Sequence, residues 1–186
     1  KLSSAVDEDR CQIRRLEVGR FAVLDAIKKR RSIRKYTSEA ITEDQINAML
    51  EAAMAAPSGN GLAPWEFIVV GDKGLREQLS KVHQWSWMAA NAPVVIVVCG
   101  KESISDHWVA DCSAATENLL LQATDMGLGG VWVGIYPRTE RENRVRQLLN
   151  IPSNVRILCL VPIGHPGEQK PPHTGFDLAK VHYDRY

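Results

Sequence analysis

A cluster of basic side chains near the N-terminus is the most chemically suggestive feature of the sequence. Six of the eight residues from Lys28 to Lys35 are lysine or arginine, and none is acidic. Arg30, Ser32 and Arg34 are spaced by two, so an extended backbone would point all three side chains to one side. Two guanidinium groups and a hydroxyl can make charge-assisted, partly bidentate hydrogen bonds to a phosphate monoester. The cluster therefore suggests a phosphate pocket, although a solvated basic surface or a nucleic-acid patch explains a bare cluster equally well.

A loop rich in proline and glycine, residues 57–65, is the second candidate. It opens with Pro57, Ser58, Gly59 and Asn60. These residues predict a turn with an exposed backbone and short polar side chains. Such a backbone can lie close to a planar heterocycle and hydrogen-bond its edge. An ordinary connection between a helix and a strand explains this loop alone at least as well.

The segment 127–134 is the third candidate, because several glycines in it precede a short apolar stretch. It follows a helical pattern and enters a strand pattern, the reverse of the order that places a pyrophosphate on a helix N-terminus. The sequence contains neither a G-x-G-x-x-G fingerprint nor a G-x-x-x-x-G-K-[ST] phosphate loop. Any nucleotide must therefore be held in another way.

The other reactive residue types show no catalytic or metal-binding pattern. The five histidines lack a spacing such as H-E-x-x-H, so no metal site is expected. No serine stands in a G-x-S-x-G setting, so hydrolase chemistry has weak support. Cys99, Cys112 and Cys159 lie in apolar runs and are expected to be buried free thiols, which fits a reducing compartment. Among the tryptophans, Trp85, Trp87 and Trp108 are candidates to line an interface or a substrate cleft.

Length and composition describe one ordinary globular domain. The chain has 186 residues, 45% of them hydrophobic and 24% charged, and no flexible linker divides it. The formal net charge of +1 gives no overall bias toward nucleic acid or membranes. The longest apolar run, Pro93–Cys99, is far shorter than the ~20 residues that cross a bilayer. Because residues 1–15 contain no apolar signal segment, we expect a cytoplasmic protein with an arm at 1–17 and a domain at 18–186.

Hydrophobic spacing and turn residues predict the elements that must position these candidates. A capping box at Thr42–Gln45 starts a helix that Pro57 stops, and a second box begins at Thr139. The other expected helices are a short one before the basic cluster, one near 75–82 and a long one from 105 or 106 to 126. Strands are expected at 65–70, 94–99, 131–135 and 155–163, with 94–99 covered on both faces. By pattern alone, this alternation favours a parallel, doubly wound sheet.

Taken in order, these motifs resemble those of the FMN-dependent nitroreductase family. Residues 26–36 are similar to the family's N-terminal signature, and 56–58 with 64–70 resemble the part that follows. The stretches 92–98, 111–121 and 127–134 are similar to the middle of the family pattern. Phe176-Asp177 and Val181-His182-Tyr183 resemble the ending of its short members. Each motif alone is weak, but their unbroken order from Phe21 to Tyr186 is specific.

The resemblance implies an α+β fold in place of the doubly wound sheet. That fold is a mixed, mainly antiparallel sheet flanked by helices, in a homodimer with FMN at the subunit interface. The implied reaction is a ping-pong transfer of hydride from NADH or NADPH to a small planar acceptor, such as a nitroaromatic or a quinone. Because the flavin carries this chemistry, no side chain is expected to be catalytic.

The resemblance also implies flavin contacts from three segments. The first would hold the phosphate, the ribitol and the pyrimidine edge, with a backbone contribution from its second member: Arg30, Arg31, Ser32 and Arg34. The second would approach from the other subunit: Pro57, Ser58, Gly59 and Asn60. The third would lie along the ring, with a backbone N–H near its last member facing N5: Trp132, Val133 and Gly134.

Two positions depart from the family pattern. The family's loop often reads P-S-x-x-N-x-Q-P-W, whereas Gly61 and Ala63 stand here in place of Asn and Gln, so Asn60 would act one residue early. The tail of the family usually offers lysine or arginine to the phosphate. In this sequence Lys170 or His173 would substitute.

Two other functions stay open at this level. Residues 28–35 could hold a flavin, another phosphorylated ligand or RNA in a protein that is not an enzyme. Alternatively, a flavoprotein could pass electrons only to a partner protein. The physiological acceptor and the choice between NADH and NADPH are not encoded in any motif, since one fold hosts several reactions.

Overall fold

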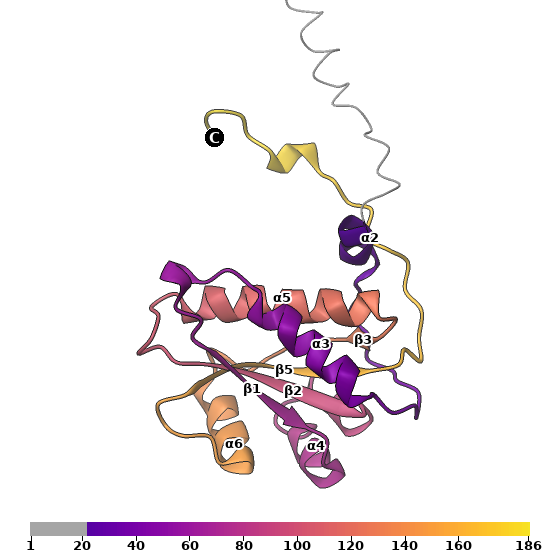
Figure 1. Ribbon diagram of the computed structural model, residues 1–186, viewed down its shortest axis with the longest axis vertical. Coiled ribbons are helices and arrows are strands. Elements are labelled where there is room, and N and C mark those ends of the chain that lie inside the picture. Colours follow the sequence, from indigo (N-terminus) through magenta and orange to yellow (C-terminus); the bar gives the residue numbers. More distant parts are fainter. Residues whose placement is uncertain (1–21) are drawn as a thin grey trace, which may run out of the picture.

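The computed structural model describes residues 22–186, which form three layers with helices on both faces of one β-sheet (Figure 1). α3 (Glu43–Met54) and α5 (Trp108–Asp125) cover one face, and α4 (Lys73–Leu79) and α6 (Thr139–Leu149) cover the other. α2 (Ala22–Lys29) lies beside the C-terminal half of α5. The arm predicted at residues 1–17 lies outside the described residues.

The sheet is antiparallel at every pairing of its named strands, which are β1 (Trp65–Val70), β2 (Val94–Gly100), β3 (Gly129–Gly130), β4 (Val133–Gly134) and β5 (Arg156–Gly164). β2 lies between β1 and β5, and both β3 and β4 pair with β5. The mainly antiparallel sheet implied by the family resemblance is confirmed. The parallel, doubly wound sheet favoured by pattern alone is wrong.

The direction of the strands follows from the connections, which a hydrophobic pattern does not record. Val70 at the end of β1 pairs with Val95 near the start of β2, so the intervening α4 and η2 (Trp87–Ala90) return the chain to the end it left. A parallel pair needs a crossover that carries the chain to the opposite end of the sheet. Alternating helix and strand signals are compatible with either path.

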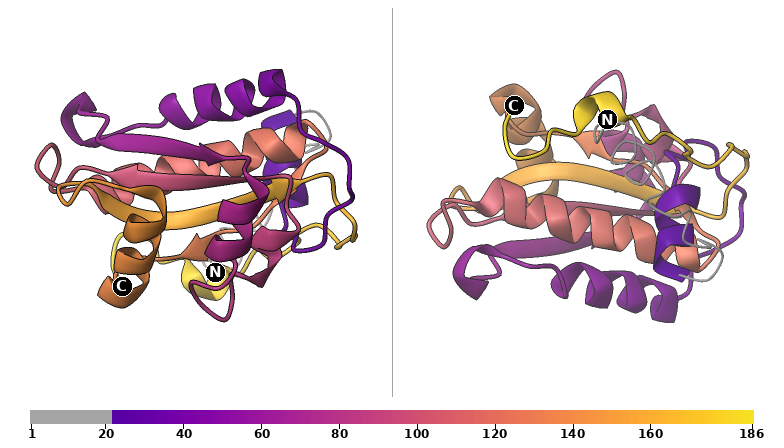
Figure 2. Two further views of the ribbon diagram at one scale, coloured as in Figure 1. Left: turned by 90° about the horizontal axis from the view of Figure 1, so that it is seen from below. Right: turned by 90° about the horizontal axis from the view of Figure 1, so that it is seen from above.

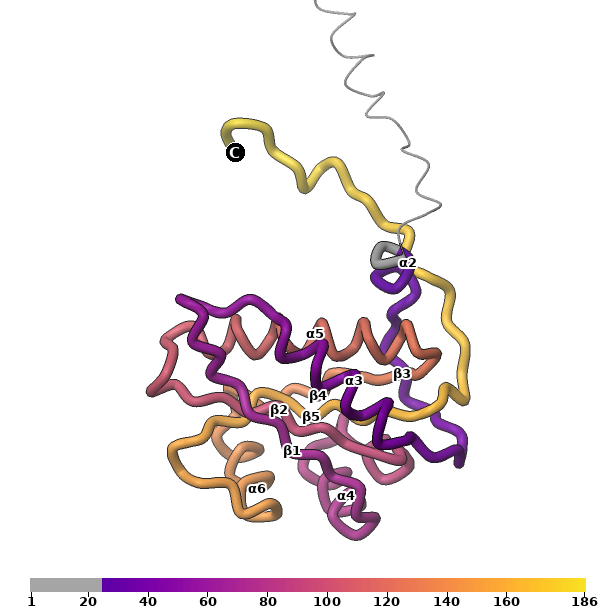
Figure 3. The backbone as a smooth tube through the Cα atoms, in the orientation of Figure 1, coloured from indigo at the N-terminus to yellow at the C-terminus, as the bar shows by residue number. Residues whose placement is uncertain are grey.

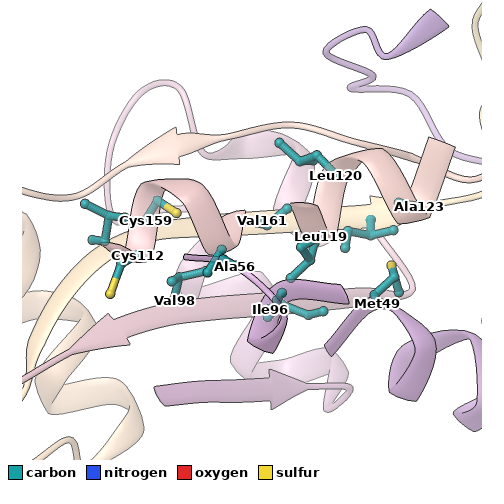
Figure 4. Packing of buried hydrophobic residues seen from close by; sticks show 14 of the residues in the cluster. Met49, Ala56, Ile96, Val98, Cys112, Leu119, Leu120, Ala123, Cys159 and Val161 are labelled. Atoms are coloured by element: carbon teal, nitrogen blue, oxygen red, sulfur yellow. The ribbon is translucent and has the colours of Figure 1, made fainter. Parts of the chain in front are cut away.

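The core has two parts, one on each face of the sheet. Along β2, alternate side chains face α3 and α5 (Val94, Ile96, Val98) or face α4 and α6 (Val95, Val97, Cys99). Figure 4 shows Met49 of α3 and Leu119 of α5 over Ile96. Every residue of β2 is buried, so the prediction of a strand covered on both sides is confirmed. Trp108 is also buried in this core and lines no cleft, contrary to expectation.

Of the two capping boxes, the first is confirmed and the second is wrong. The Thr42 hydroxyl accepts a hydrogen bond from Gln45 N at 3.2 Å, and Gln45 Oε1 accepts one from Thr42 N at 3.0 Å. At α6 the N-cap is Arg138, which makes no side-chain cap bond. The backbone turns helical one residue earlier than predicted, so Thr139 is already inside the helix and its hydroxyl has no cap to make.

Two other elements have bounds that differ from the predicted ones. The strand expected at 131–135 is interrupted, because only β3 and β4 pair with β5 and residues 131–132 lie between them. The long helix expected from residue 105 or 106 starts at Trp108. Ser105 is used differently, since its hydroxyl accepts a hydrogen bond from His107 N at 3.1 Å and donates one to Asp111 Oδ2 at 2.7 Å.

The thiols of Cys99, Cys112 and Cys159 are free and buried, as predicted. Burial raises the pKa of Cys99 and of Cys112 to about 12, so both stay protonated at neutral pH. Across residues 22–186, no helix is both long and apolar enough to cross a membrane.

Beyond β5 the chain leaves the three-layer body and ends in a tail that carries η3 (Leu178–Lys180) (Figure 1). Figure 2 shows the same tail in two views along the long axis of the molecule. The tail is exposed throughout from residue 171 to 186. Its apolar side chains include Phe176, which is 79% exposed, and Leu178 and Tyr183 beyond it. So much exposed apolar surface is unusual for a monomer and is typical of an interaction segment.

Candidate functional site

Beyond Lys29, which ends α2, the basic cluster is held in an extended conformation by the tail that follows β5. The backbones of the two segments run side by side, with Thr37 N donating to His165 O at 2.9 Å and Gly167 N to Lys35 O at 2.8 Å. At the other end, His173 N donates to Lys28 O at 2.8 Å. Figure 3 shows this return of the tail toward α2. The extended backbone on which the spacing argument depended is therefore present.

On its other side the cluster is anchored to the start of β3. Ile33 N donates to Gly130 O at 3.0 Å, and the Ile33 side chain is buried. A Cβ on Gly129 would lie 2.7 Å from Ile33 Cγ1, so only glycine allows this approach. The Tyr36 hydroxyl donates to Ile33 O at 2.7 Å, and burial raises the pKa of this hydroxyl.

Arg34 lines a cavity of about 400 Å³ together with the predicted ring-facing residues Trp132, Val133 and Gly134. The cavity is completed by residues on either side of this strip (His83, Trp85, Val131, Tyr136, Pro137, Arg138, Arg141). Within residues 22–186, the Arg34 guanidinium forms no salt bridge. An unpaired cation beside a strip of aromatic and backbone surface suits an anionic planar ligand.

The other members of the cluster do not share that cavity. Arg30 Nε lies 3.1 Å from Glu117 Oε1 of α5, so this guanidinium already has an anionic partner. Arg31 donates through Nη1 to the carbonyl of Pro171. A second cavity, of about 430 Å³, lies on this side of the segment and includes Lys29 and Lys170.

Lys170 is the tail residue whose side chain reaches the cluster. Its amine donates to the carbonyl of Ser32 and lies 3.3 Å from Glu168 Oε1. Glu168 Oε1 also accepts a hydrogen bond from Arg34 N at 2.6 Å. This hydrogen bond holds the pKa of Glu168 below its ordinary value; burial opposes the shift, and Lys170 reinforces it. His173 is exposed and contacts Lys28 through its backbone N–H.

The proline-glycine loop lies beyond the N-terminal end of α5, away from α2 and the basic cluster (Figure 1). Gly59 N donates to Asp111 Oδ1 at 2.8 Å, and the Ser58 hydroxyl accepts a hydrogen bond from Ala63 N at 2.9 Å. Asn60 has a positive φ of 53°. Within one chain this loop does not line the Arg34 cavity, so its predicted role across a subunit interface stays a prediction.

Several residues of this region were not singled out from the sequence. Asp111 holds the proline-glycine loop, and Arg138 and Arg141 line the Arg34 cavity. Asp111 gave no signal, because a polar residue in the first turn of a helix is common. The sequence did carry a signal for Arg138 and Arg141, because both arginines follow the ring-facing strip within seven positions of Gly134.

His83 also lines the Arg34 cavity, and it is held in its neutral form. Burial lowers the pKa of His83, and the cationic Arg141 lowers it further. Its Nδ1 accepts a hydrogen bond from Trp85 N at 3.0 Å, which requires that nitrogen to be unprotonated. The positive charge of the cavity therefore comes from its arginines.

Comparison with known proteins shows which family shares this sequence and fold. The sequence profile of the Nitroreductase family matches residues 27–90 and 85–165. A Methanothermobacter thermautotrophicus protein described as NADH dehydrogenase/NAD(P)H nitroreductase is 40% identical over 173 residues, covering 91% of each chain. The solved structure of a protein with that description from Bacteroides thetaiotaomicron has a TM-score of 0.87 at 39% identity, covering 90% of this chain and 99% of the other. An FMN-dependent nitroreductase from Clostridium difficile has a TM-score of 0.84 at 34% identity, covering 88% and 99%.

The structural matches show that the chain has the nitroreductase fold, because its sheet and helices superpose over nearly the whole length of the solved proteins. The chain belongs to the nitroreductase family.

Proposed function

We propose that this chain holds FMN beside Arg34 and passes reducing equivalents from NADH or NADPH to a small planar acceptor. The protein is an NAD(P)H-dependent FMN oxidoreductase of the nitroreductase type. The observation that carries the proposal is the Arg34 cavity, where an unpaired guanidinium lies beside the Trp132–Gly134 strip. The described functions of the Methanothermobacter and Clostridium relatives support the nicotinamide and the FMN respectively.

The residues present fit this cofactor. Gly134 leaves the strip open, since a Cβ there would meet nothing nearer than Trp132 Nε1 at 4.0 Å. Arg34 supplies a cation for the pyrimidine edge. Ser32 and Arg30 lie next to it on the extended segment, and Lys170 brings a further cation to Ser32. We therefore favour Lys170 over His173 as the tail residue that approaches the phosphate.

The chain's own residues bind, orient and stabilise charge. When bound, FMN supplies the hydride exchange between the nicotinamide and the acceptor. Arg34, fixed by the Glu168 hydrogen bond to its backbone, would stabilise negative charge at the pyrimidine edge without reorganising. The backbone of Gly134 would face the reactive edge of the ring. Trp132 and Trp85 would restrict the cleft to flat molecules.

We propose that the protein is a homodimer in which each site is completed by the partner's proline-glycine loop. Pro57, Ser58, Gly59 and Asn60 lie away from the Arg34 cavity of their own chain, and a second copy could bring them to it. The exposed apolar side chains of the tail, which a partner would cover, support the same assembly.

Two-substrate steady-state kinetics test the proposed reaction. A ping-pong cycle predicts parallel double-reciprocal lines when NADH or NADPH is varied at several fixed concentrations of a quinone or a nitroaromatic. Intersecting lines would contradict an alternating cycle on one site. Flavin-containing protein without turnover of any small acceptor would favour a flavin-storage or electron-transfer protein instead.

A further inference from the structure

Arg138 and Arg141 are two cations of the Arg34 cavity that have no assigned partner. Neither forms a salt bridge within the described part of the chain. Their helix neighbours behave differently: Arg144 Nη2 lies 2.6 Å from Glu140 Oε1, and Arg146 Nη2 lies 3.1 Å from Glu142 Oε1. The two arginines at the cavity thus stand out from an otherwise neutralised helix.

The position of Arg141 is fixed relative to the ring-facing strip. Its Nη1 donates to Gly134 O at 3.3 Å, which leaves its other donors for a ligand. Arg138 lies one helical turn before it and lines the same cavity. Two guanidinium groups are therefore placed beside the backbone that the proposed function sets against the reactive edge of the flavin.

The charge of this cavity calls for an anion. None of its described lining residues is acidic, and His83 is neutral for the reasons given above. With Arg34 assigned to the flavin, Arg138 and Arg141 remain two cations on the wall of one cavity. An anionic group docked there would meet complementary positive charge.

We infer that Arg138 and Arg141 form an anion subsite for a carboxylate or phosphate of the molecule that docks beside Gly134. The inference rests on the proposed function, which supplies the docked reactant. Two sources share this chemistry: the 2′-phosphate that NADPH carries and NADH lacks, and a carboxylate on the acceptor. The subsite would set the preference for anionic over neutral reactants.

A direct binding experiment tests the subsite without turnover. Benzoate is titrated against the tryptophan fluorescence of the holoprotein, because Trp85 and Trp132 line the cavity. Benzyl alcohol serves as the neutral ligand of similar shape. Arg141→Gln and Arg138→Gln should each weaken benzoate binding about 10-fold or more, as expected for loss of a hydrogen bond to a charged group. Arg144→Gln, on the same helix but paired with Glu140, should leave benzoate binding unchanged.

Kinetic arms then separate the two sources. The ratio of kcat/KM between variant and wild type is measured for 4-nitrobenzoate against 4-nitrobenzyl alcohol, and for NADPH against NADH. A loss confined to nitrobenzoate assigns the subsite to the acceptor, and a loss confined to NADPH assigns it to the nicotinamide. Losses that are equal for nitrobenzoate and nitrobenzyl alcohol and also equal for NADPH and NADH, or benzoate binding that both variants retain, would overturn a subsite for the carboxylate or the 2′-phosphate. Wild-type protein that binds benzoate in an Arg141-dependent way but turns over no nicotinamide would contradict the proposed function alone.

Discussion

Arg34 and Arg30 show how different two arginines of one cluster can be. Arg30 is paired with Glu117, whereas Arg34 opens onto the cavity with no carboxylate partner among residues 22–186. Because no carboxylate of the described residues already holds the Arg34 guanidinium, it can bind a ligand anion without first breaking an ion pair, so Arg34 is the member of the cluster on which flavin binding should depend most.

Replacing Arg34 with alanine should therefore weaken FMN binding. Loss of a charge-assisted hydrogen bond is worth about 1.5–3 kcal/mol, which corresponds to a roughly 10- to 100-fold increase in the Kd of FMN. Flavin fluorescence quenching on titration of apoprotein measures this Kd directly.

Arg31→Ala is the matched control, because its side chain faces the second cavity. Its FMN affinity should stay within about threefold of wild type, since only its backbone is expected to contribute. If Arg31→Ala lost FMN while Arg34→Ala kept it, the flavin would lie in the other cavity and our assignment would be wrong.

Glu168 links the tail to the cluster and makes that link sensitive to acid. Its pKa in the folded protein lies below the ordinary value of 4.5. A carboxylate of lowered pKa contributes stability above its unfolded-state pKa and loses it as the pH falls through the lower, folded value. The hydrogen bond from Arg34 N is therefore at full strength at neutral pH and weakens below pH 4.5.

Glu168→Gln should accordingly be less stable than wild type at neutral pH, and the difference should fade as the pH is lowered below 4.5. Urea unfolding of the apoprotein at a series of pH values measures the difference in the free energy of unfolding between Glu168→Gln and wild type. Glu39→Gln, at an exposed neighbour of His165, is the control and should show a smaller difference at neutral pH. A gap between Glu168→Gln and wild type that stays constant into acid would mean that this carboxylate is not the titrating group.

At the scale of the elements, the two capping boxes separate what a local pattern can predict from what it cannot. Thr42 and Gln45 satisfy each other's backbone groups, and this exchange needs nothing beyond four consecutive residues. Near Thr139 the same T-x-x-[E/Q] pattern follows a segment whose path is set by β4 and by Pro137, and the helix begins one residue early. The pattern is present in both segments, but whether the capping box forms depends on the path that the fold gives the chain before the helix.

Thr42→Ala should lower the free energy of unfolding by about 1 kcal/mol, the usual cost of losing an N-cap hydroxyl. Thr139→Ala, the matched substitution at the start of α6, should change it by no more than about 0.5 kcal/mol, because that hydroxyl caps nothing. Chemical denaturation of both variants measures the difference. Equal losses would show that the second box forms after all.

The same reasoning explains which elements were predicted well. β1 and β2 are marked by apolar runs, interrupted in β1 by Glu66, and were placed to within a residue. β3 and β4 are two residues each and owe their existence to β5, a partner far along the chain, so the sequence around them suggested one longer strand. Asp111 holds the proline-glycine loop through a contact between residues 52 positions apart, which explains why no local pattern singled it out. Arg138 and Arg141 follow the ring-facing strip closely in the sequence, but that they line the same cavity is decided by the fold.

At the scale of the whole molecule, the tail is the part that the body of one chain does not cover. Its backbone contacts with the cluster end at His173, and the apolar residues beyond are exposed. Burying side chains such as Phe176 and Leu178 against a second chain would contribute about 1.5–3 kcal/mol for each one. Dimer formation and completion of the flavin site would then depend on the same residues.

Deleting residues 174–186 should convert a dimer into a folded monomer that retains FMN poorly. The contacts that hold the basic cluster are left intact, because they end at His173. Light scattering coupled to gel filtration gives the mass, and circular dichroism shows that the shortened chain still folds. A full-length chain that is monomeric with bound FMN would contradict a site shared between subunits.

The most direct test of the central claim is the visible spectrum of the purified protein under anaerobic conditions. We predict a yellow protein whose released flavin is FMN, and whose colour is bleached by NADH or NADPH and restored by a quinone. A colourless protein, or a yellow one that neither nicotinamide reduces, would contradict the account.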